Sequence, residues 1–323
     1  MTKTSLKLPS FAKINWRLRI LGKRPDGYHE VVTVLQTISL CDEMTFNVEC
    51  EEGLLRVTCD DPAVPTDHTN LIIRAAGALQ DCFPRACAEV TVKKRIPAQG
   101  GLGGASSNAA VTLLALYALW KAGMPGSKAE VSRQGAKTQR SLFEMVDPGV
   151  LGADVPFFLV GGSCIATGTG TKLKPLPDNP KQHLIVVTPN ARVSTAKAYH
   201  SLNAGSLTTS DSVSILSSSL ADEFSADSRQ WPLRNDFERV IFEIEPEIER
   251  AKIALLEAGA RGALLAGSGS SVFGVFADEA ARDRALENLR SEAGWKVFSC
   301  HTVSRAEYSG AMNSSGFPLI TLS

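Results

Sequence analysis

Between positions 11 and 20, every second residue of the chain is apolar. Successive side chains of a strand point to opposite faces, so this period of two predicts a half-buried strand. The intervening residues are polar, and two of them, Lys13 and Asn15, therefore share one face. The sequence Lys-Arg-Pro-Asp-Gly at 23–27 is typical of a turn, which ends this strand.

Similar apolar patterns predict strands further along the chain, at 31–40, 44–48, 54–58, 90–92, 184–188 and 295–303. Helical periodicity is found at 70–82, from the loop at 100–104 to about Trp120, at 235–258 with a break at Pro246, and at 280–291. Residues 262–276 are predicted to form strand, glycine loop and strand. Residues 204–230, rich in Ser, Asp and Thr, are predicted to be a loop with a short helix at 213–220.

This mixture of strands and helices predicts an α+β fold. The length of 323 residues suits two domains, at about 100–200 residues per domain. Pro177-Asp-Asn-Pro180 is the expected boundary, which gives domains 1–180 and 181–323.

Charge and hydropathy exclude several classes of partner. Lys plus Arg and Asp plus Glu both number 34, so the net charge is zero and binding to nucleic acid is not expected. The longest apolar run, Ala109 to Trp120, is too short to span a bilayer, so no membrane partner is expected. A small anionic substrate would need a local cationic site. No oligomeric state is predicted.

Seven cysteines occur, an odd number without any Cys-x-x-Cys pair. We therefore expect free thiols in a reducing cytoplasm. The polar start of the chain does not resemble a signal peptide, which also favours a cytoplasmic protein. The five histidines form no metal-ligand cluster in the sequence.

Four glycines crowd the five residues Gly100 to Gly104, and Ser106 and Ser107 follow at the expected start of a helix. Unpaired N–H groups and the positive dipole end make a helix N-terminus suitable for phosphate, and glycine lets the backbone approach closely. The alternative is a tight strand-to-helix turn capped by serine. The pattern lacks the Lys-Ser/Thr of a P-loop, so it indicates another class of nucleotide site.

Residues 97–110, Pro-Ala-Gln-Gly-Gly-Leu-Gly-Gly-Ala-Ser-Ser-Asn-Ala-Ala, resemble the ATP loop of the galactokinase, homoserine kinase, mevalonate kinase and phosphomevalonate kinase superfamily. Three further segments narrow the resemblance to the 4-diphosphocytidyl-2-C-methyl-D-erythritol kinase family. They are Phe-Ala-Lys-Ile-Asn at 11–15 with Arg-Pro-Asp-Gly-Tyr-His at 24–29, Leu-Gly-Ala-Asp-Val-Pro-Phe at 151–157, and Leu-Ala-Gly-Ser-Gly-Ser-Ser-Val-Phe at 265–273. Gln99 and Ala105 depart from the small residues expected beside the loop, and the segment from Trp120 to Asp154 is longer than the family pattern.

The resemblance implies a two-domain small-molecule kinase with its active site in the interdomain cleft. Its ATP-binding residues would be Asn70, Leu71, Lys94, Pro97, Ala98, Gln99, Gly100, Gly101, Leu102, Gly103, Gly104, Ala105, Ser106 and Ser107. Magnesium would accompany ATP, with Ser107 as the expected ligand. A solvated strand end is the other interpretation of Lys94.

Asp154 would be the catalytic base and Lys13 its charged partner. Phosphoryl transfer needs a group that accepts the alcohol proton and positive charge beside the moving phosphoryl group, and these residue types supply both. Taken singly, Lys13 also fits a solvated charge on an exposed sheet, and Asp154 a helix or turn cap.

The implied substrate-binding residues are Asn15, Tyr28, His29, Tyr199, Gly267, Ser268 and Gly269. An aromatic ring can stack on cytosine and a histidine can hydrogen-bond its edge, so the reaction expected is phosphorylation of the 2-hydroxyl of 4-diphosphocytidyl-2-C-methyl-D-erythritol in non-mevalonate isoprenoid precursor synthesis. A homoserine or mevalonate-type acceptor is an alternative, but it lacks a nucleobase for Tyr28 and His29. A catalytically inactive nucleotide sensor is another, although Lys13 and Asp154 are both present.

Overall fold

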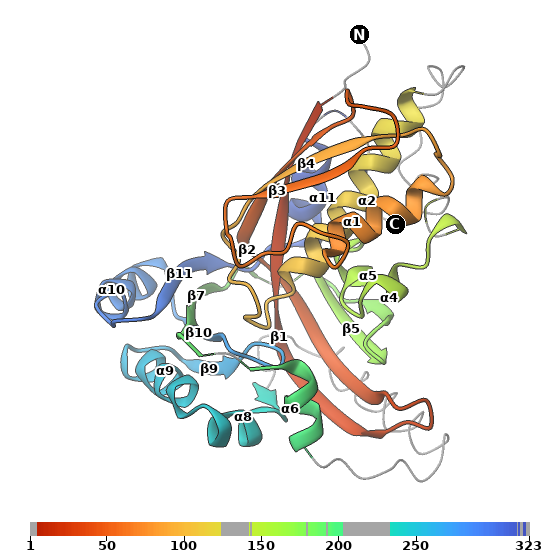
Figure 1. Ribbon diagram of the computed structural model, residues 1–323. Coiled ribbons are helices and arrows are strands. Elements are labelled where there is room, and N and C mark those ends of the chain that lie inside the picture. Colours follow the sequence, from red (N-terminus) through yellow and green to blue (C-terminus); the bar gives the residue numbers. More distant parts are fainter. Residues whose placement is uncertain are drawn as a thin grey trace.

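The computed structural model describes residues 5–123, 142, 144–178, 180–191, 193–202, 233–314, 316 and 319–320, and these build two β-sheets (Figure 1). The larger sheet has the strand order β3-β4-β2-β1-β8, with β5 paired to β2 and β6 to β5. Its strands are β1 (Ser5–Lys23), β2 (His29–Asn47), β3 (Leu55–Cys59), β4 (Ala88–Lys93), β5 (Ser163–Gly168), β6 (Lys172–Pro175) and β8 (Arg234–Asn235).

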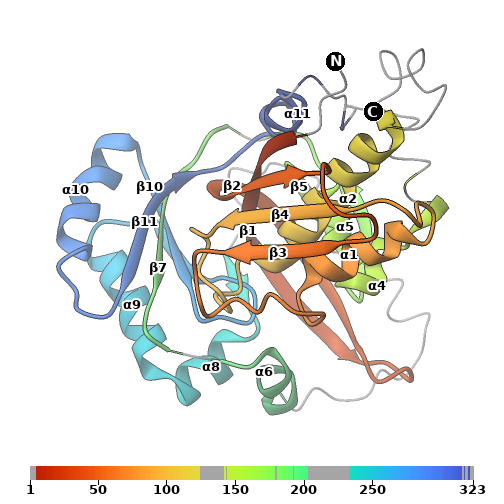
Figure 2. The same ribbon diagram turned by 45° about the horizontal axis from the view of Figure 1, so that its top comes forward.

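The smaller sheet is antiparallel, in the order β11-β7-β10-β9. Its strands are β7 (His183–Thr188), β9 (Gly262–Leu265), β10 (Val272–Phe276) and β11 (Lys296–His301). Figure 2 shows three helices along its outer side: α8 (Glu238–Ile244), α9 (Pro246–Glu257) and α10 (Glu279–Leu289). The predicted break at Pro246 is confirmed, because α9 begins at this proline.

Helices α1 (Leu71–Gln80) and α2 (Gly104–Gly123) pack on each other and against the larger sheet (Figures 1 and 2). The short helices α4 (Pro148–Leu151) and α5 (Val155–Phe158) follow beside α2, and α6 (Thr195–Ser201) lies near α8. The last helix, α11 (Arg305–Asn313), returns to the larger sheet, where Tyr308 packs on Phe11 and its hydroxyl donates to the carbonyl of Phe158. The α+β fold is therefore confirmed.

Strand β1 is buried on both faces over 10–18, so the prediction of a half-buried strand was wrong there. Ala12, Ile14 and Trp16 join a core that also takes in the smaller sheet, including Leu184, Leu264 and Phe273. Its polar residues are buried as well, with Lys13 4% and Asn15 2% exposed. A buried ammonium group is stable only where it is paired or hydrogen-bonded. The burial of Lys13 therefore marks this stretch of β1 as part of a candidate functional site.

Strand β2 runs unbroken from His29 to Asn47, where two separate strands were predicted. One end of β2 pairs with β4 and the other with β5, so a single long strand serves two neighbours. The predicted loop at 204–230 with its helix lies outside the described residues, as does most of the extension that follows Trp120. Among the described helices, none is both long and apolar enough to cross a membrane.

The prediction of seven free thiols was wrong for one pair. Cys50 and Cys87 form a disulfide with their Cα atoms 5.9 Å apart. Cys50 follows β2 and Cys87 precedes β4, and the antiparallel pairing of these strands brings the two residues within bonding range. The remaining cysteines are free: Cys41, Cys59, Cys82, Cys164 and Cys300.

Candidate active site

Lys13 and Asp154 meet although they are 141 positions apart in the chain, and the distance between Lys13 Nζ and Asp154 Oδ2 is 3.5 Å. The Lys13 side chain is 5% exposed, which excludes the solvated-charge alternative. Asp154 stands at the N-cap of α5 but its side chain makes no capping hydrogen bond, which excludes that alternative too. Its side chain is 33% exposed, so one carboxylate is both paired with an ammonium and open to a ligand.

Asn15 fixes the lysine from the other side. Lys13 Nζ donates to Asn15 Oδ1 at 2.9 Å, and Asn15 Nδ2 donates to Thr33 Oγ1 at 2.7 Å. The amide orientation is set by these two bonds, because only its oxygen can accept from an ammonium. Asn15 therefore faces the same site as Lys13, as the alternation of β1 predicted.

The glycine loop at 100–104 wraps over Lys13, and α2 begins at Gly104. The backbone N–H of Lys13 donates to the carbonyl of Leu102 at 2.9 Å. A Cβ atom on Gly103 would lie 3.0 Å from Lys13 Cγ, tighter than an ordinary contact. Gly101 and Gly103 both have positive φ angles, 74° and 72°, so glycine is required by the backbone as well as by the space.

The loop between β9 and β10 closes on the first loop. A Cβ on Gly101 would overlap the carbonyl oxygen of Ala266, and one on Gly267 would lie 2.8 Å from the carbonyl oxygen of Gly101 and 3.2 Å from Lys13 Nζ. Ser271 donates its N–H to the carbonyl of Gly100 at 3.1 Å. Three segments predicted to form one site, around positions 13, 100–104 and 267–269, are therefore in direct contact.

Lys94 lies beneath the loop and is not a solvated strand end. Its ammonium forms an ion pair with Asp42 at 2.7 Å, with the two side chains 7% and 0% exposed. It also donates to the carbonyl of Ile96 at 2.5 Å, and a Cβ on Gly104 would lie 3.2 Å from Lys94 Nζ. Lys94 thus braces the start of α2, and Asp42 is a partner that sequence reasoning missed.

Ser107 does not fit the magnesium ligand that was predicted. It has no exposed surface, and its hydroxyl accepts a hydrogen bond from Ser10 at 2.8 Å. Its neighbour Ser106 is half-buried, and its Oγ would lie 3.4 Å from a Cβ on Gly152, in the 151–157 segment that carries Asp154. Within the described residues, no group of three or more His, Cys, Asp and Glu side chains is placed to hold a metal.

Asn70 and Leu71 start α1 at the edge of the same site. Asn70 caps the helix, since its Oδ1 accepts from the N–H of Ile72 at 2.8 Å and its Nδ2 donates to the carbonyl of Pro65. Leu71 Cδ1 would lie 3.9 Å from a Cβ on Gly152. These two predicted ATP-binding residues therefore border the segment that carries Asp154.

The sequence profile described as GHMP kinases N terminal domain matches residues 70–162, and that described as GHMP kinases C terminal matches residues 219–294. The 4-diphosphocytidyl-2-C-methyl-D-erythritol kinase of Solibacter usitatus (strain Ellin6076) is 39% identical over 312 residues, covering 93% of this chain and 90% of that protein. The kinase of the same name from Citrifermentans bemidjiense is 38% identical over 305 residues, covering 94% and 100%.

Solved structures agree. A crystal structure of 4-(cytidine 5'-diphospho)-2C-methyl-D-erythritol kinase superposes with a TM-score of 0.69 and 30% identity, covering 92% of this chain and 99% of that one. The chain belongs to the 4-diphosphocytidyl-2-C-methyl-D-erythritol kinase family. Homoserine kinase from Cytophaga hutchinsonii ATCC 33406, at 20% identity and a TM-score of 0.61, shares the fold of this family.

Three aromatic side chains were predicted to recognise the base: Tyr28, His29 and Tyr199. Tyr28, in the turn between β1 and β2, is 66% exposed. His29 stacks on Tyr199, with ring centroids 4.8 Å apart and planes at 28°. Burial and the charge of Asp154 raise the pKa of Tyr199 to about 12, so this ring stays protonated and lies within electrostatic reach of Asp154.

The rings of His29 and Tyr199 are thus in direct contact with each other. Burial and nearby Lys23 lower the pKa of His29, so the imidazole is neutral at pH 7. A neutral imidazole can accept as well as donate a hydrogen bond. It is therefore suited to the mixed donor and acceptor edge of cytosine.

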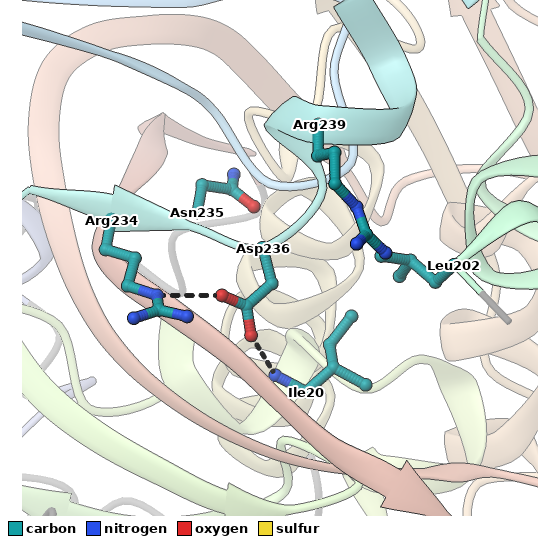
Figure 3. A pocket seen from close by; sticks show the side chains of 6 residues that line it. All are labelled: Ile20, Leu202, Arg234, Asn235, Asp236 and Arg239. Atoms are coloured by element: carbon teal, nitrogen blue, oxygen red, sulfur yellow. Dashed lines mark hydrogen bonds and ion pairs between the residues drawn. The ribbon is translucent and has the colours of Figure 1, made fainter. Parts of the chain in front are cut away.

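Sequence reasoning missed the segment at 234–237, which was predicted only as the start of a helix. Asn235 and Asp236 precede α8, and Phe237 packs edge-on against Tyr199 at 4.8 Å. Figure 3 shows a pocket of about 410 Å³ beside this segment, lined by Ile20, Leu202, Arg234, Asn235, Asp236 and Arg239. None of the predicted site residues lines it, and no local pattern sets Asn235 and Asp236 apart from the charged residues Arg234, Glu238 and Arg239 around them.

Proposed function

We propose that this protein transfers the γ-phosphoryl group of ATP to the 2-hydroxyl of 4-diphosphocytidyl-2-C-methyl-D-erythritol, in non-mevalonate isoprenoid precursor synthesis. The observation that carries the proposal is the ion pair between Lys13 and Asp154 directly beneath a glycine loop. The relatives named for this reaction support the choice of substrate.

The chemistry follows from the positions of the two charges. Asp154 would accept the proton of the attacking hydroxyl, and Lys13 would stabilise the negative charge that develops on the moving phosphoryl group. Asn15 and the carbonyl of Leu102 hold the lysine in place through its ammonium and its backbone N–H. Such preorganisation matters because a charge that is already oriented needs no reorganisation during transfer.

The phosphates of ATP would lie at the start of α2, where backbone N–H groups and the helix dipole favour negative charge. The predicted contacts from Pro97 to Ser107, and from Asn70 and Leu71, are part of this proposal. Lys94 would act by bracing the loop, since its ammonium is committed to Asp42 and Ile96. Magnesium enters only as the counter-ion of ATP, and no protein ligand is assigned to it.

We also propose a boundary between two domains near residue 180, because β6 ends at Pro175 and the smaller sheet begins at His183. Beyond this boundary, β8 and α11 return to the larger sheet. The active site would lie between the two sheets, with Gly267 reaching Lys13 from the second domain and Ser268 and Gly269 following it in the same loop. A cytoplasmic location, where ATP is available, is part of the same proposal.

The direct test of substrate choice is an ADP-release assay with three acceptors. ADP should form with 4-diphosphocytidyl-2-C-methyl-D-erythritol and far more slowly with mevalonate or homoserine, because only the first offers a base to Tyr28, His29 and Tyr199. Equal rates with all three acceptors would remove the nucleobase from the proposal.

Replacing Tyr28 by alanine should weaken substrate binding by about 1–3 kcal/mol if the exposed ring stacks on cytosine. ATP affinity should stay near that of the wild type, because the side chain is 66% exposed and is not among the contacts of the glycine loops. Isothermal titration with each ligand separately measures both effects. An equal loss for ATP and for the diphosphocytidyl substrate would show that Tyr28 serves only the turn.

A further inference from the structure

Asn235 joins three parts of the candidate active site. It belongs to β8, a two-residue strand that pairs in parallel with β1 through Arg17↔Arg234 and Leu18↔Asn235. The residue is 5% exposed, although its side chain is polar. A buried amide of this kind needs partners for its oxygen and both of its N–H groups.

Those partners pin the second glycine loop. Asn235 Nδ2 donates to the carbonyl of Leu265 at 2.9 Å and to the carbonyl of Gly267 at 2.7 Å. These carbonyls flank Ala266, the residue whose own carbonyl oxygen lies against Gly101. The Asn235 side chain therefore holds the backbone of the second glycine loop on both sides of Ala266, the residue that contacts the loop at 100–104.

Gly267 in turn lies against Lys13. A Cβ on Gly267 would be 3.2 Å from Lys13 Nζ and 2.8 Å from the carbonyl oxygen of Gly101. A movement of the second glycine loop would therefore also move Gly267 away from the ammonium group of Lys13. Asn235 itself touches neither Lys13 nor the phosphate loop in these contacts, so it acts through Gly267.

The 234–237 segment is also tied to the strand that carries Lys13. Asp236 accepts from the backbone N–H of Ile20 at 3.0 Å and from Arg234 Nε at 2.9 Å, as Figure 3 shows. Asn235 Oδ1 accepts from the N–H of Phe237 at 3.0 Å, and the ring of Phe237 packs on Tyr199. The same amide therefore helps to set the position of the aromatic stack.

We propose that Asn235 is a positioning residue for phosphoryl transfer, which holds the loop at 266–271 against Lys13 and the phosphate loop. The inference rests on the proposed kinase function, and it adds a residue for which neither the motifs nor the relatives' names indicate a role. The observation behind it is the pair of hydrogen bonds to the carbonyls of Leu265 and Gly267.

Two substitutions separate positioning from simple packing. Asn235→Asp keeps the size of the side chain and an acceptor for Phe237, but it removes both N–H donors and turns a carboxylate toward two carbonyl oxygens. Asn235→Ala removes all three hydrogen bonds. Misplacement of reacting groups by about 1 Å costs on the order of 10²-fold in rate, so we expect turnover to fall on the order of 10- to 100-fold in both variants.

Asn313 provides a matched control. Its Nδ2 donates to the carbonyl of Ile320 at 2.7 Å, and its Oδ1 accepts from the N–H groups of Leu319 and Ile320. These bonds secure α11, away from both glycine loops. Asn313→Ala should lower the melting temperature, as Asn235→Ala should, but it should leave kcat near the wild-type value.

The experiment measures kcat and KM for both substrates, the melting temperature, and amide hydrogen exchange in the wild type and these three variants. We expect kcat to fall in the Asn235 variants with KM for ATP changed little, and exchange to rise at 266–271. Near-normal kcat in Asn235→Ala, or an equal loss of kcat in Asn313→Ala at a matched melting temperature, would overturn the proposal.

Amide hydrogen exchange tests the positioning role of Asn235 independently of the proposed kinase function. If the wild type does not phosphorylate the diphosphocytidyl substrate, the proposed function fails, yet exchange at 266–271 still reports whether Asn235 holds the loop. Unchanged exchange at 266–271 in Asn235→Asp would refute the positioning role, even if the wild type is a fully active kinase.

Discussion

Asp154→Asn should lower turnover about 10²–10³-fold while ATP binding changes little. The substitution keeps the shape of the side chain and removes the carboxylate that would accept the hydroxyl proton. It also leaves the ammonium of Lys13 without its charged partner at 3.5 Å. Steady-state kinetics with isothermal titration of ATP separates the loss in chemistry from any loss in binding.

Asp147→Asn is the matched control for this variant. Asp147 lies seven positions earlier and caps α4, with its Oδ1 accepting from the N–H of Gly149 at 2.9 Å. Asparagine caps a helix about as well as aspartate, so neither stability nor turnover should change noticeably. Near-normal turnover in a well-folded Asp154→Asn protein would remove the proposed base from the mechanism.

Lys13→Ala and the double variant test whether the two charges act as a unit. Groups that act together give losses that do not add, so the double variant should be scarcely slower than the worse single variant. Fully additive losses would indicate that Lys13 and Asp154 serve separate steps, with Lys13 acting on the phosphates alone.

Gly101→Ala is the second change with a large expected effect. The new methyl group would overlap the backbone oxygen of Ala266 and lie 2.9 Å from that of Gly269, and neither oxygen is the end of a flexible side chain. The loops must separate, so we expect turnover to fall on the order of 10²-fold. Backbone strain at a positive φ adds a loss of about 1–3 kcal/mol in the free energy of unfolding.

Gly53→Ala is the control that separates the steric clash expected in Gly101→Ala from the backbone strain of a positive φ. Gly53 has a φ of 76°, close to the 74° of Gly101, but a Cβ there would meet no atom within 4 Å. This control should lose the same strain energy of about 1–3 kcal/mol in stability and no activity. Chemical denaturation and ADP release measured on both proteins make the comparison. If Gly101→Ala behaves like Gly53→Ala, the contact between the two loops is not needed for catalysis.

The central residues of the site could be predicted because a short stretch of sequence is enough to indicate the chemistry of each motif. A run of glycines before an apolar helix indicates a phosphate loop wherever the rest of the chain lies, and alternation along β1 placed Lys13 and Asn15 together. The resemblance then brought in Asp154 from a distant segment. The structure confirms that these residues meet, and their catalytic roles stay predictions.

Other features depend on contacts that no local pattern contains. Alternation could not show that Lys13 on the polar face of β1 is buried, because its neighbours there, the two glycine loops and Asp154, come from distant parts of the chain. Lys94 looked like a strand end because its partner Asp42 lies on another strand. The disulfide could not be predicted without the register of β2 and β4. The role proposed for Asn235 depends on its hydrogen bonds to two carbonyls about 30 positions away.

The most direct test of the kinase assignment is the identity of the phosphorylated product. Wild-type protein incubated with ATP and 4-diphosphocytidyl-2-C-methyl-D-erythritol should yield ADP and one new phosphate monoester, with phosphorus–carbon couplings in the NMR spectrum that place it on the 2-hydroxyl. The same mixture with Asp154→Asn should yield about 10²–10³-fold less product over the same time. ATP hydrolysis without a new ester, or a phosphate on another hydroxyl, would contradict the account.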